Sequence, residues 1–440
     1  MSANRRLMAA LLTVGAFSVV ARFAGVAKEL VVAYRFGRQN ELDAFLIAFT
    51  LPLFTVTVVA ASLTAALIPT LIEVRTREGS RAAQRLFANV MFVAVLVLVV
   101  AAVVLAGLSR WILPLLGSQF GGEKLALTQR LFFILLPVLV VSGLSTVWAA
   151  VLNAEHRFAL AAGATFLTPA VPTVFVLLTD GSISVFALAV GTLCGYLGEA
   201  SLIGWGLRRR GVSLLPVWTG LDSRTREVGR QYAPMVAGAL IMSGSILVNQ
   251  GMAGTLDAGS VAALSYGNKL TSLVISVGAL SLSTAALPQF SRMVAERDYA
   301  GLRHTLKTYS GLIVVATVPL TVGLIVLSTP IVRLLFQRGA FTSGDTEVVS
   351  RVQACFLIQL PFYLLVTLIV RAISALKKNT ALMWGTAISL GTNIVLCYIF
   401  RKWFGVSGIA LATSAMIFVS LCYLAPTCSR LLSKAAQSGS

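Results

Sequence analysis

The sequence predicts an all-α polytopic membrane protein with about twelve transmembrane helices, arranged as two six-helix pseudo-repeats around a central cavity. Hydrophobic residues make up 57% of the 440 residues and charged residues only 12%, about half of the roughly 25% charged residues typical of soluble domains. Mean hydropathy is +0.88, and the apolar residues fall in long stretches along the whole chain. This pattern excludes a soluble enzyme with a single anchor, and it excludes an outer-membrane barrel, whose strands alternate apolar and polar residues.

Each predicted span is long enough to cross a bilayer, which takes about 20 mostly apolar residues. In chain order the segments are 8–34, 43–72, 86–108, 129–152, 158–178, 183–207, 232–255, 260–290, 308–330, 350–374, 380–400 and 405–427. Several contain proline, namely Pro52, Pro69, Pro137, Pro169, Pro172, Pro288 and Pro361. Proline is tolerated in membrane helices where neighbours or waters satisfy the freed carbonyls, so these residues are interpreted as packing features that also mark points where a helix bends.

The basic residues predict the orientation of the chain. Of the 35 Lys and Arg residues, 22 fall on one set of loops and helix ends and 10 on the other. The positive-inside rule therefore puts both termini in the cytoplasm of a multi-pass protein. Arg5 and Arg6 precede an apolar run that is too long for a signal peptide and that no small-residue cleavage site closes, so we expect a retained first helix. Most of the formal charge of +19 is thus a topology signal, and nucleic acid is not an expected partner.

Short similarities at an offset near 220 residues indicate an internal duplication. Ser62–Pro69 reads SLTAALIP and Leu282–Pro288 reads LSTAALP, and both precede a basic loop. Val185–Gly191 (VFALAVG) is similar to Gly408–Ser414 (GIALATS). We therefore predict an N-terminal six-helix half over 1–207, a basic cytoplasmic linker over 208–230 and a C-terminal six-helix half over 231–440. An even number of spans per half makes the repeats parallel. This plan favours an alternating-access transporter over a channel.

Residues with metal-binding or catalytic chemistry are few. The cysteines, which show no C-x-x-C spacing, are Cys194, Cys355, Cys397, Cys422 and Cys428. They are interpreted as small buried hydrophobic residues. The only histidines, His156 and His304, lie next to basic loops. No metal site, no catalytic residues and no cofactor are expected, and there is no Walker motif for ATP.

Three basic residues, Arg22, Lys28 and Lys269, lie inside predicted spans. A charge at mid-bilayer costs about 2.5–3.5 kcal/mol on insertion scales, so an intramembrane charge is by default a functional hypothesis. Arg22 and Glu29 are seven residues apart, which places them on one helical face, whereas Lys28 is expected on another face. Gly25 shares the Arg22 face, where it lets a ligand or a neighbouring backbone approach closely.

Each of these residues also has a structural alternative. Arg22 and Glu29 would then form a packing ion pair, and Lys28 would extend toward the membrane surface. Glu199, in the sixth predicted span, is either a helix-packing residue or a coupling residue. Asp43, which heads the second span, is either a helix N-cap or a substrate or gate residue.

Basic residues from both halves predict a cavity that selects anions. Arginine in particular binds phosphate through two parallel hydrogen bonds. A hydrophobic substrate with a phosphate or diphosphate head fits such a site in a membrane.

At these residues the chain resembles the MurJ/MviN family of lipid II flippases, within the multidrug/oligosaccharidyl-lipid/polysaccharide exporter superfamily. Ala21–Phe54 (ARFAGVAKELVVAYRFGRQNELDAFLIAFTLPLF) is similar to the family pattern S-R-x-x-G-x-x-R-[DE], a short loop ending in F-G, and T-D-A-F-x-x-A-F-x-x-P. Leu335–Asp345 (LFQRGAFTSGD) is similar to L-F-x-x-G-x-F-T, and Asn153–Phe158 (NAEHRF) to L-N-x-x-x-R-F. The similarity extends over nearly the whole chain.

The resemblance implies roles for individual residues. Arg22 and Lys28 match two cavity-lining basic residues, with Lys28 standing where the family has Arg. Asp43 matches the acidic residue of T-D-A-F, and Lys269 matches an Arg in the family's eighth helix. These four residues are therefore expected to bind substrate, and Glu29 and Glu199 are the candidates for coupling or gating.

The sequence also departs from the family pattern. After Pro52 the family continues N-L-x-R-R-x-x-A-E-G, whereas Leu53–Ser62 reads LFTVTVVAAS and has no charge. Ser272 stands where the family has an acidic partner for the eighth-helix Arg. The family commonly has fourteen spans, the last two forming a groove for the lipid tail, against the twelve predicted here. The implied substrate is thus lipid II or another polyprenyl-diphosphate-linked glycan of a surface polysaccharide.

The resemblance implies a non-enzymatic flippase of the bacterial cytoplasmic (inner) membrane. Its partners would be the lipid-linked glycan, the bilayer and a possible coupling ion. Membrane potential or an ion gradient would supply the energy, since each charge is worth about 2.3 kcal/mol per 100 mV. The alternatives are a drug or cation antiporter of the same superfamily, which would use Glu29 and Glu199, and a non-transporting scaffold for glycan synthesis.

Overall fold

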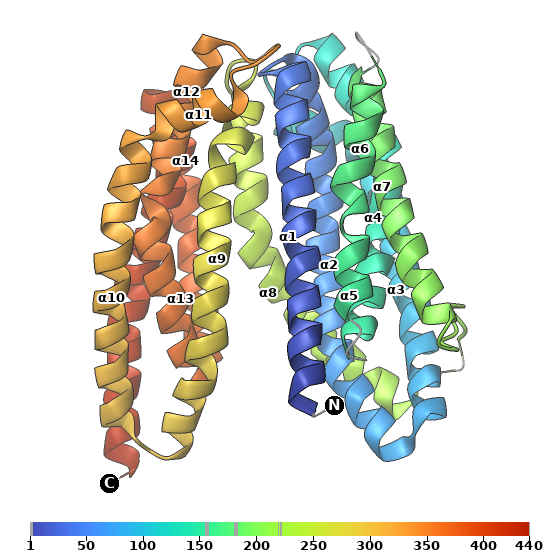
Figure 1. Ribbon diagram of the computed structural model, residues 1–440, viewed down its shortest axis with the longest axis vertical. Coiled ribbons are helices and arrows are strands. Elements are labelled where there is room, and N and C mark those ends of the chain that lie inside the picture. The colour runs from blue at the N-terminus through green and yellow to red at the C-terminus, as the bar shows by residue number, and fades with distance from the viewer. Residues whose placement is uncertain (1–2, 155–157, 180–183, 219, 221, 440) are drawn as a thin grey trace. The chain divides into compact units, whose positions relative to one another are not determined.

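The computed structural model describes residues 3–154, 158–179, 184–218, 220 and 222–439, with side chains from residue 19 onward except 158, 284, 285, 438 and 439 (Figure 1). All regular secondary structure in these residues is helical. Residues 155–157 of the Asn153–Phe158 turn, His156 among them, lie outside the described residues, as do the side chains of Arg5 and Arg6.

Backbone contacts divide the chain into two compact units, Met1–Ser243 and Gly244–Ser440. The boundary falls inside a helix, α8 (Ser223–Ala253), downstream of the linker expected at 208–230. The organisation into six-helix halves over 1–207 and 231–440 stays a prediction.

Unit 1 is a bundle of long helices. Its helices before α8 are α1 (Ala3–Phe36), α2 (Asn40–Glu78), α3 (Ser80–Leu116), α4 (Gly122–Ala154), α5 (Phe158–Ala164), α6 (Leu167–Leu177) and α7 (Ser184–Arg208). The most extensive contacts join α2 to α4, α6 to α7 and α4 to α7, and α1 packs on α5 and α6.

Unit 2 contains the end of α8 and six further helices. These are α9 (Ser260–Ala295), α10 (Tyr299–Val326), α11 (Ser328–Phe336), α12 (Ser343–Leu357), α13 (Gln359–Ala375) and α14 (Asn379–Gly439). α13 packs against α9, α10 and α14, and Figure 1 shows α10 (gold) and α14 (orange to red) as long helices of this unit.

The all-α polytopic fold is confirmed. Ten helical segments of the described residues are long and apolar enough to cross a membrane. One of them, α14, covers both of the last two predicted spans and breaks at Gly405, whose φ of 57° and ψ of −134° are non-helical. α1 covers the first predicted span.

Two predicted spans are each built from a pair of helices. The span 158–178 is divided between α5 and α6, and 350–374 between α12 and α13. Pro169 and Pro361 are the third residues of α6 and α13, where the missing N–H leaves no helical hydrogen bond unmade. By contrast, Pro52 and Pro137 lie within continuous helices.

Buried apolar side chains hold each unit together. In unit 1 a cluster on α2, α3, α4, α5 and α7 includes Leu67, Phe87 and Val147. In unit 2 a cluster on α9, α10, α13 and α14 includes Phe290 and Leu368. Large apolar side chains also lie exposed along the outside of α3 and α10, such as Val103 and Val315, as expected of helix faces whose solvent is lipid.

Candidate functional site

A hollow of about 450 Å³ in unit 1 contains three of the predicted site residues. We call it the α1–α7 hollow. Its lining comes from α1, α2, α6, α7 and the break between α5 and α6, and consists of Ala21, Arg22, Gly25, Lys28, Glu29, Phe45, Phe49, Thr165, Thr168, Pro169, Thr192 and Tyr196. Its volume lies in the range of about 300–1,000 Å³ that small-molecule sites occupy.

The charged residues of the hollow all come from α1. Arg22, Gly25 and Glu29 line it together, as their spacing on one helical face predicts. Lys28 lines it as well, although its position on the helix predicts another face. Its Nζ lies 3.4 Å from Oε1 of Glu29, because the long flexible stem of lysine carries the ammonium group around the helix. The hollow thus holds two cations and one carboxylate.

Aromatic rings form a wall of the same hollow. Phe45 and Phe49, one turn apart on α2, stack with ring centroids 5.8 Å apart, and Phe49 lies 6.4 Å from Tyr196 of α7. Such faces offer large apolar contact area beside the charges. Sequence reasoning missed this wall, although the i, i+4 spacing of Phe45 and Phe49 puts both on one face of a helix.

The threonine hydroxyls of the hollow donate to backbone carbonyls three or four residues earlier in the chain. Thr165 donates to the carbonyl of Ala162, and Thr168 donates to that of Thr165. Thr192 likewise donates to Leu188 over 2.7 Å. These oxygen atoms therefore present lone pairs, and a ligand with hydroxyl groups can donate to them.

Asp43 lies outside the lining of the hollow, in a buried ion pair. Its Oδ2 lies 2.9 Å from Nζ of Lys124, at the start of α4. Asp43 is not an N-cap, because the N-cap of α2 is Gln39 and Asp43 lies within the first turn. Nζ of Lys124 also lies over the ring of Phe120, 3.9 Å from its centroid.

The two remaining candidates do not line the hollow. Glu199 is half-buried on α7, one turn beyond Tyr196, and is not among the lining residues. Lys269 is half-buried on α9, in unit 2. The roles of all the predicted site residues stay predictions.

The hollow carries two basic side chains against one carboxylate, so its formal charge is positive. Within the part of the chain that the structure describes, no group of three His, Cys, Asp or Glu side chains could hold a metal ion. The five cysteines are free thiols. Guanidinium and ammonium groups beside aromatic rings and hydroxyl oxygens suit a polar, negatively charged headgroup.

Solved structures show which fold the chain has. A structure of lipid II flippase MurJ in an inward closed conformation superposes with a TM-score of 0.80, at 24% identity over 96% of this chain and 90% of that one. An inward-facing multidrug resistance MATE family transporter of the MOP superfamily gives 0.77 at 14% identity, over 98% of this chain and 99% of that one. The chain therefore shares the polytopic helical fold of these two structures.

Sequence comparison identifies the family. The family profile described as lipid II flippase MurJ matches residues 32–438. A probable lipid II flippase MurJ of Vibrio cholerae is 25% identical over 438 residues, 96% of this chain and 82% of that protein. The lipid II flippase MurJ of Burkholderia cenocepacia is 26% identical over 422 residues, 92% of this chain and 80% of that protein. The chain belongs to the lipid II flippase MurJ family, and the predicted resemblance is confirmed.

Proposed function

We propose that the protein moves a polyprenyl-diphosphate-linked saccharide, such as lipid II, from the cytoplasmic to the outer leaflet by alternating access. The observation that carries the proposal is the α1–α7 hollow, which holds two basic side chains within a predicted span. A charge in a span is costly, and an anionic headgroup offsets that cost. Family membership supports the substrate class.

The lining suggests how a diphosphate-sugar headgroup would bind. Arg22 and Lys28 would contact the diphosphate. The rings of Phe45, Phe49 and Tyr196 would pack against the apolar faces of the sugar, and the threonine oxygens would accept from its hydroxyl groups. The lipid tail would stay in the bilayer. Transport of this kind makes and breaks no covalent bond.

Glu29 would compete with the substrate for Lys28. The ammonium group of Lys28 lies 3.4 Å from the carboxylate of Glu29. An incoming diphosphate would therefore have to share Lys28 with Glu29 or displace Glu29 from it. This competition gives Glu29 a coupling or gating role. Lys269, on α9, and Glu199, on α7, are further candidates for substrate binding and for coupling.

The experiment is transport of fluorescent lipid II in proteoliposomes, read as accessibility of the headgroup to a membrane-impermeant reagent. Arg22→Gln and Lys28→Gln are expected to slow transport about tenfold or more, since a hydrogen bond to a charged group contributes about 1.5–3 kcal/mol. Lys28→Arg, which restores the family residue, is expected to retain transport. Gly25→Leu is expected to block it without changing charge, because a side chain at Gly25 enters open space in the hollow.

Arg110→Gln is the matched control, since Arg110 is exposed in the last two turns of α3 and does not line the hollow. If Arg22→Gln and Lys28→Gln both transported lipid II at the wild-type rate, the hollow would not be the substrate site. Other polyprenyl-diphosphate glycans are assayed in parallel to identify the glycan. An antiporter would be supported instead if the wild type moved no glycan but exported drugs, and if Glu29→Gln abolished that drug efflux.

A further inference from the structure

Glu199 is a carboxylate within α7, a helix that is long and apolar enough to cross a membrane. The other charged residue of this helix is Arg208, nine residues further on. The side chain of Glu199 is half-buried, and it forms no ion pair with another described residue. An ionised carboxylate within a span is costly unless it is paired. Glu199 therefore differs from Glu29, whose carboxylate has Lys28 beside it.

Two polar side chains lie close to the carboxylate of Glu199. Ser145 of α4 lies next to it and is only 2% exposed, and its hydroxyl has no other hydrogen-bond partner among the described residues. Tyr196 lies one turn earlier on the same face of α7, and it lines the α1–α7 hollow. A hydroxyl group can donate to an ionised carboxylate or accept from a protonated one, so Ser145 suits both states of Glu199.

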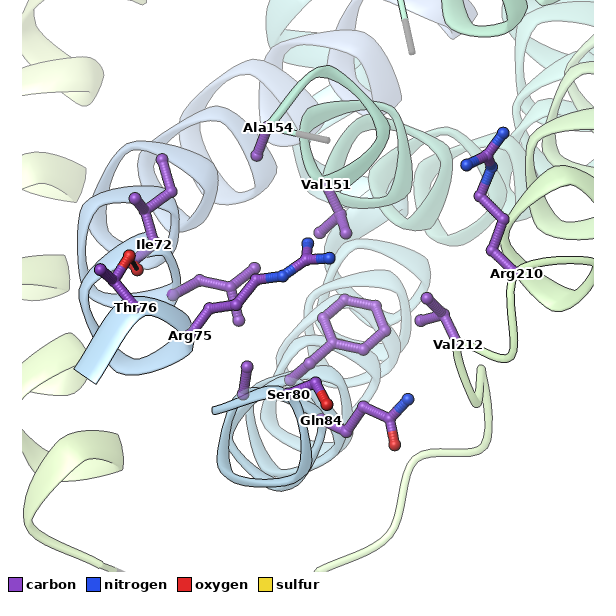
Figure 2. A pocket seen from close by; sticks show the side chains of 12 residues that line it. Ile72, Arg75, Thr76, Ser80, Gln84, Val151, Ala154, Arg210 and Val212 are labelled. Atoms are coloured by element: carbon purple, nitrogen blue, oxygen red, sulfur yellow. Dashed lines mark hydrogen bonds between the residues drawn. The ribbon is translucent and has the colours of Figure 1, made fainter. Parts of the chain in front are cut away.

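The helices packed on α7, which are α2, α4, α5 and α6, carry their charged residues only near their ends. α5 and α6 have none, and α2 has them within its first four and last six residues. The charged residues of α4 lie at least 15 positions before Ser145 and are Glu123, Lys124 and Arg130. At the other end of α4, Arg75 of α2 and Val151 line a hollow of about 520 Å³ (Figure 2). Val151 is six residues beyond Ser145, about 9 Å along the helix.

The charge state of Glu199 matters for the neighbouring hollow. A carboxylate removed from water without a counter-charge is stabilised by taking up a proton, which makes it neutral. The hollow itself contains the charged groups of Arg22, Lys28 and Glu29. An ionised Glu199, one turn beyond Tyr196, would add a second negative charge and oppose an anionic headgroup, whereas a neutral carboxyl group would not.

We propose that Glu199 is a proton-binding site, and that its proton favours binding of the anionic headgroup in the α1–α7 hollow. Because that headgroup is the ligand of the proposed function, this role of Glu199 rests on that function. The proton adds to one carboxylate oxygen and returns to water when it is released, and no other bond changes. Linkage is reciprocal, so the bound headgroup also strengthens proton binding. The ion that binds together with the headgroup is then a proton.

The first test is infrared difference spectroscopy of the full chain in lipid, between neutral and alkaline buffer. The C=O stretch of a protonated carboxyl group is measured without any substrate. The wild type is expected to show such a band at neutral pH, and Glu199→Gln is expected to lack it. Glu123→Gln is the matched control, because Glu123 is exposed at the start of α4, and it should keep the band. The same carboxyl band in wild type and Glu199→Gln would overturn the proposal.

The second test measures the affinity for fluorescent lipid II in detergent as the pH is raised. The wild-type affinity should fall about tenfold as Glu199 loses its proton, as expected for one nearby unit charge at the effective dielectric constant of a protein. Glu199→Gln should keep the high affinity throughout, because its amide is neutral, and Glu199→Asp should restore the pH dependence.

The same pH dependence in wild type and Glu199→Gln would overturn the linkage between the proton and the headgroup. A protein that binds no lipid II at any pH would refute the proposed function and that linkage with it. The infrared band decides separately whether Glu199 holds a proton, so the two failures are distinguishable.

Discussion

Asp43 and Lys124 form an ion pair that joins the first turn of α2 to the first turn of α4. The side chain of Asp43 is 1% exposed and that of Lys124 is 12% exposed, with 2.9 Å between the charged atoms. Each charge is removed from water and is compensated by the other. Because the two residues lie on the most extensively packed helix pair of unit 1, the pair holds a central contact of that unit.

Replacing either residue alone is therefore expected to destabilise the protein. Asp43→Asn leaves the ammonium group of Lys124 nearly buried without its counter-charge, a change that costs about 3–5 kcal/mol in other proteins. The midpoint of thermal unfolding in detergent should fall. Asp43→Asn/Lys124→Gln should recover part of the loss, since neither charge is then left alone.

Glu123→Gln, at the exposed residue next to Lys124, is the control for this prediction. The opposite result would be an Asp43→Asn protein that unfolds at the wild-type temperature but no longer transports. That result would assign Asp43 to substrate binding or gating, the role that its match to the family motif implies.

At the scale of helices, α6 and α7 approach each other through glycine. Gly191 and Gly195 are four residues apart on α7, so they lie on one face. A Cβ at Gly191 would lie 2.7 Å from Cα of Pro172, and one at Gly195 would lie 2.9 Å from the carbonyl oxygen of Leu167. Small residues at such a spacing let membrane helices pack backbone to backbone, and this packing positions Thr168 and Thr192 in the α1–α7 hollow.

Alanine at either glycine is expected to push the two helices apart. Overpacking of this kind typically costs about 1–3 kcal/mol, so Gly191→Ala and Gly195→Ala should lower the unfolding midpoint. Gly25→Ala is the matched comparison, because a Cβ there meets nothing within 4 Å. Its midpoint should stay level or rise with the better helix propensity of alanine. Equal losses at all three positions would show that helix spacing is not the cause.

For the whole molecule, the distribution of basic residues predicts that both termini lie in the cytoplasm. A fluorescent protein that matures only in the cytoplasm should fluoresce when fused after Ser440. Alkaline phosphatase at the same place should be inactive. Fusions after Lys402, at the end of the eleventh predicted span, should behave in the opposite way. Active phosphatase at the C-terminus would show that the predicted orientation is wrong.

Hydropathy alone was enough to predict the membrane class and most of the helices that are long and apolar enough to cross a bilayer. Whether a segment of about 20 residues crosses a bilayer depends on its own composition and length, so the property is local. The same reasoning identified Arg22, Lys28 and Lys269, because a charge stands out within an apolar stretch. The sequence did not show which prolines accompany a helix break. Pro52 lies within a continuous helix, whereas Pro361 lies just after the break between α12 and α13.

Thus the sequence by itself determined that this is a polytopic helical membrane protein, which segments are long and apolar enough to span a bilayer, and which few charges lie within those segments. The family, too, is recognisable from its motifs. Only the tertiary structure decided that Lys28 joins Arg22 and Glu29 in one hollow. It also decided that Phe49 contacts Tyr196 there. The pairing of Asp43 with Lys124, 81 residues away, was likewise visible only in the structure. The reason is physical: spanning depends on local composition, whereas these contacts depend on how helices distant in sequence rotate and pack against one another.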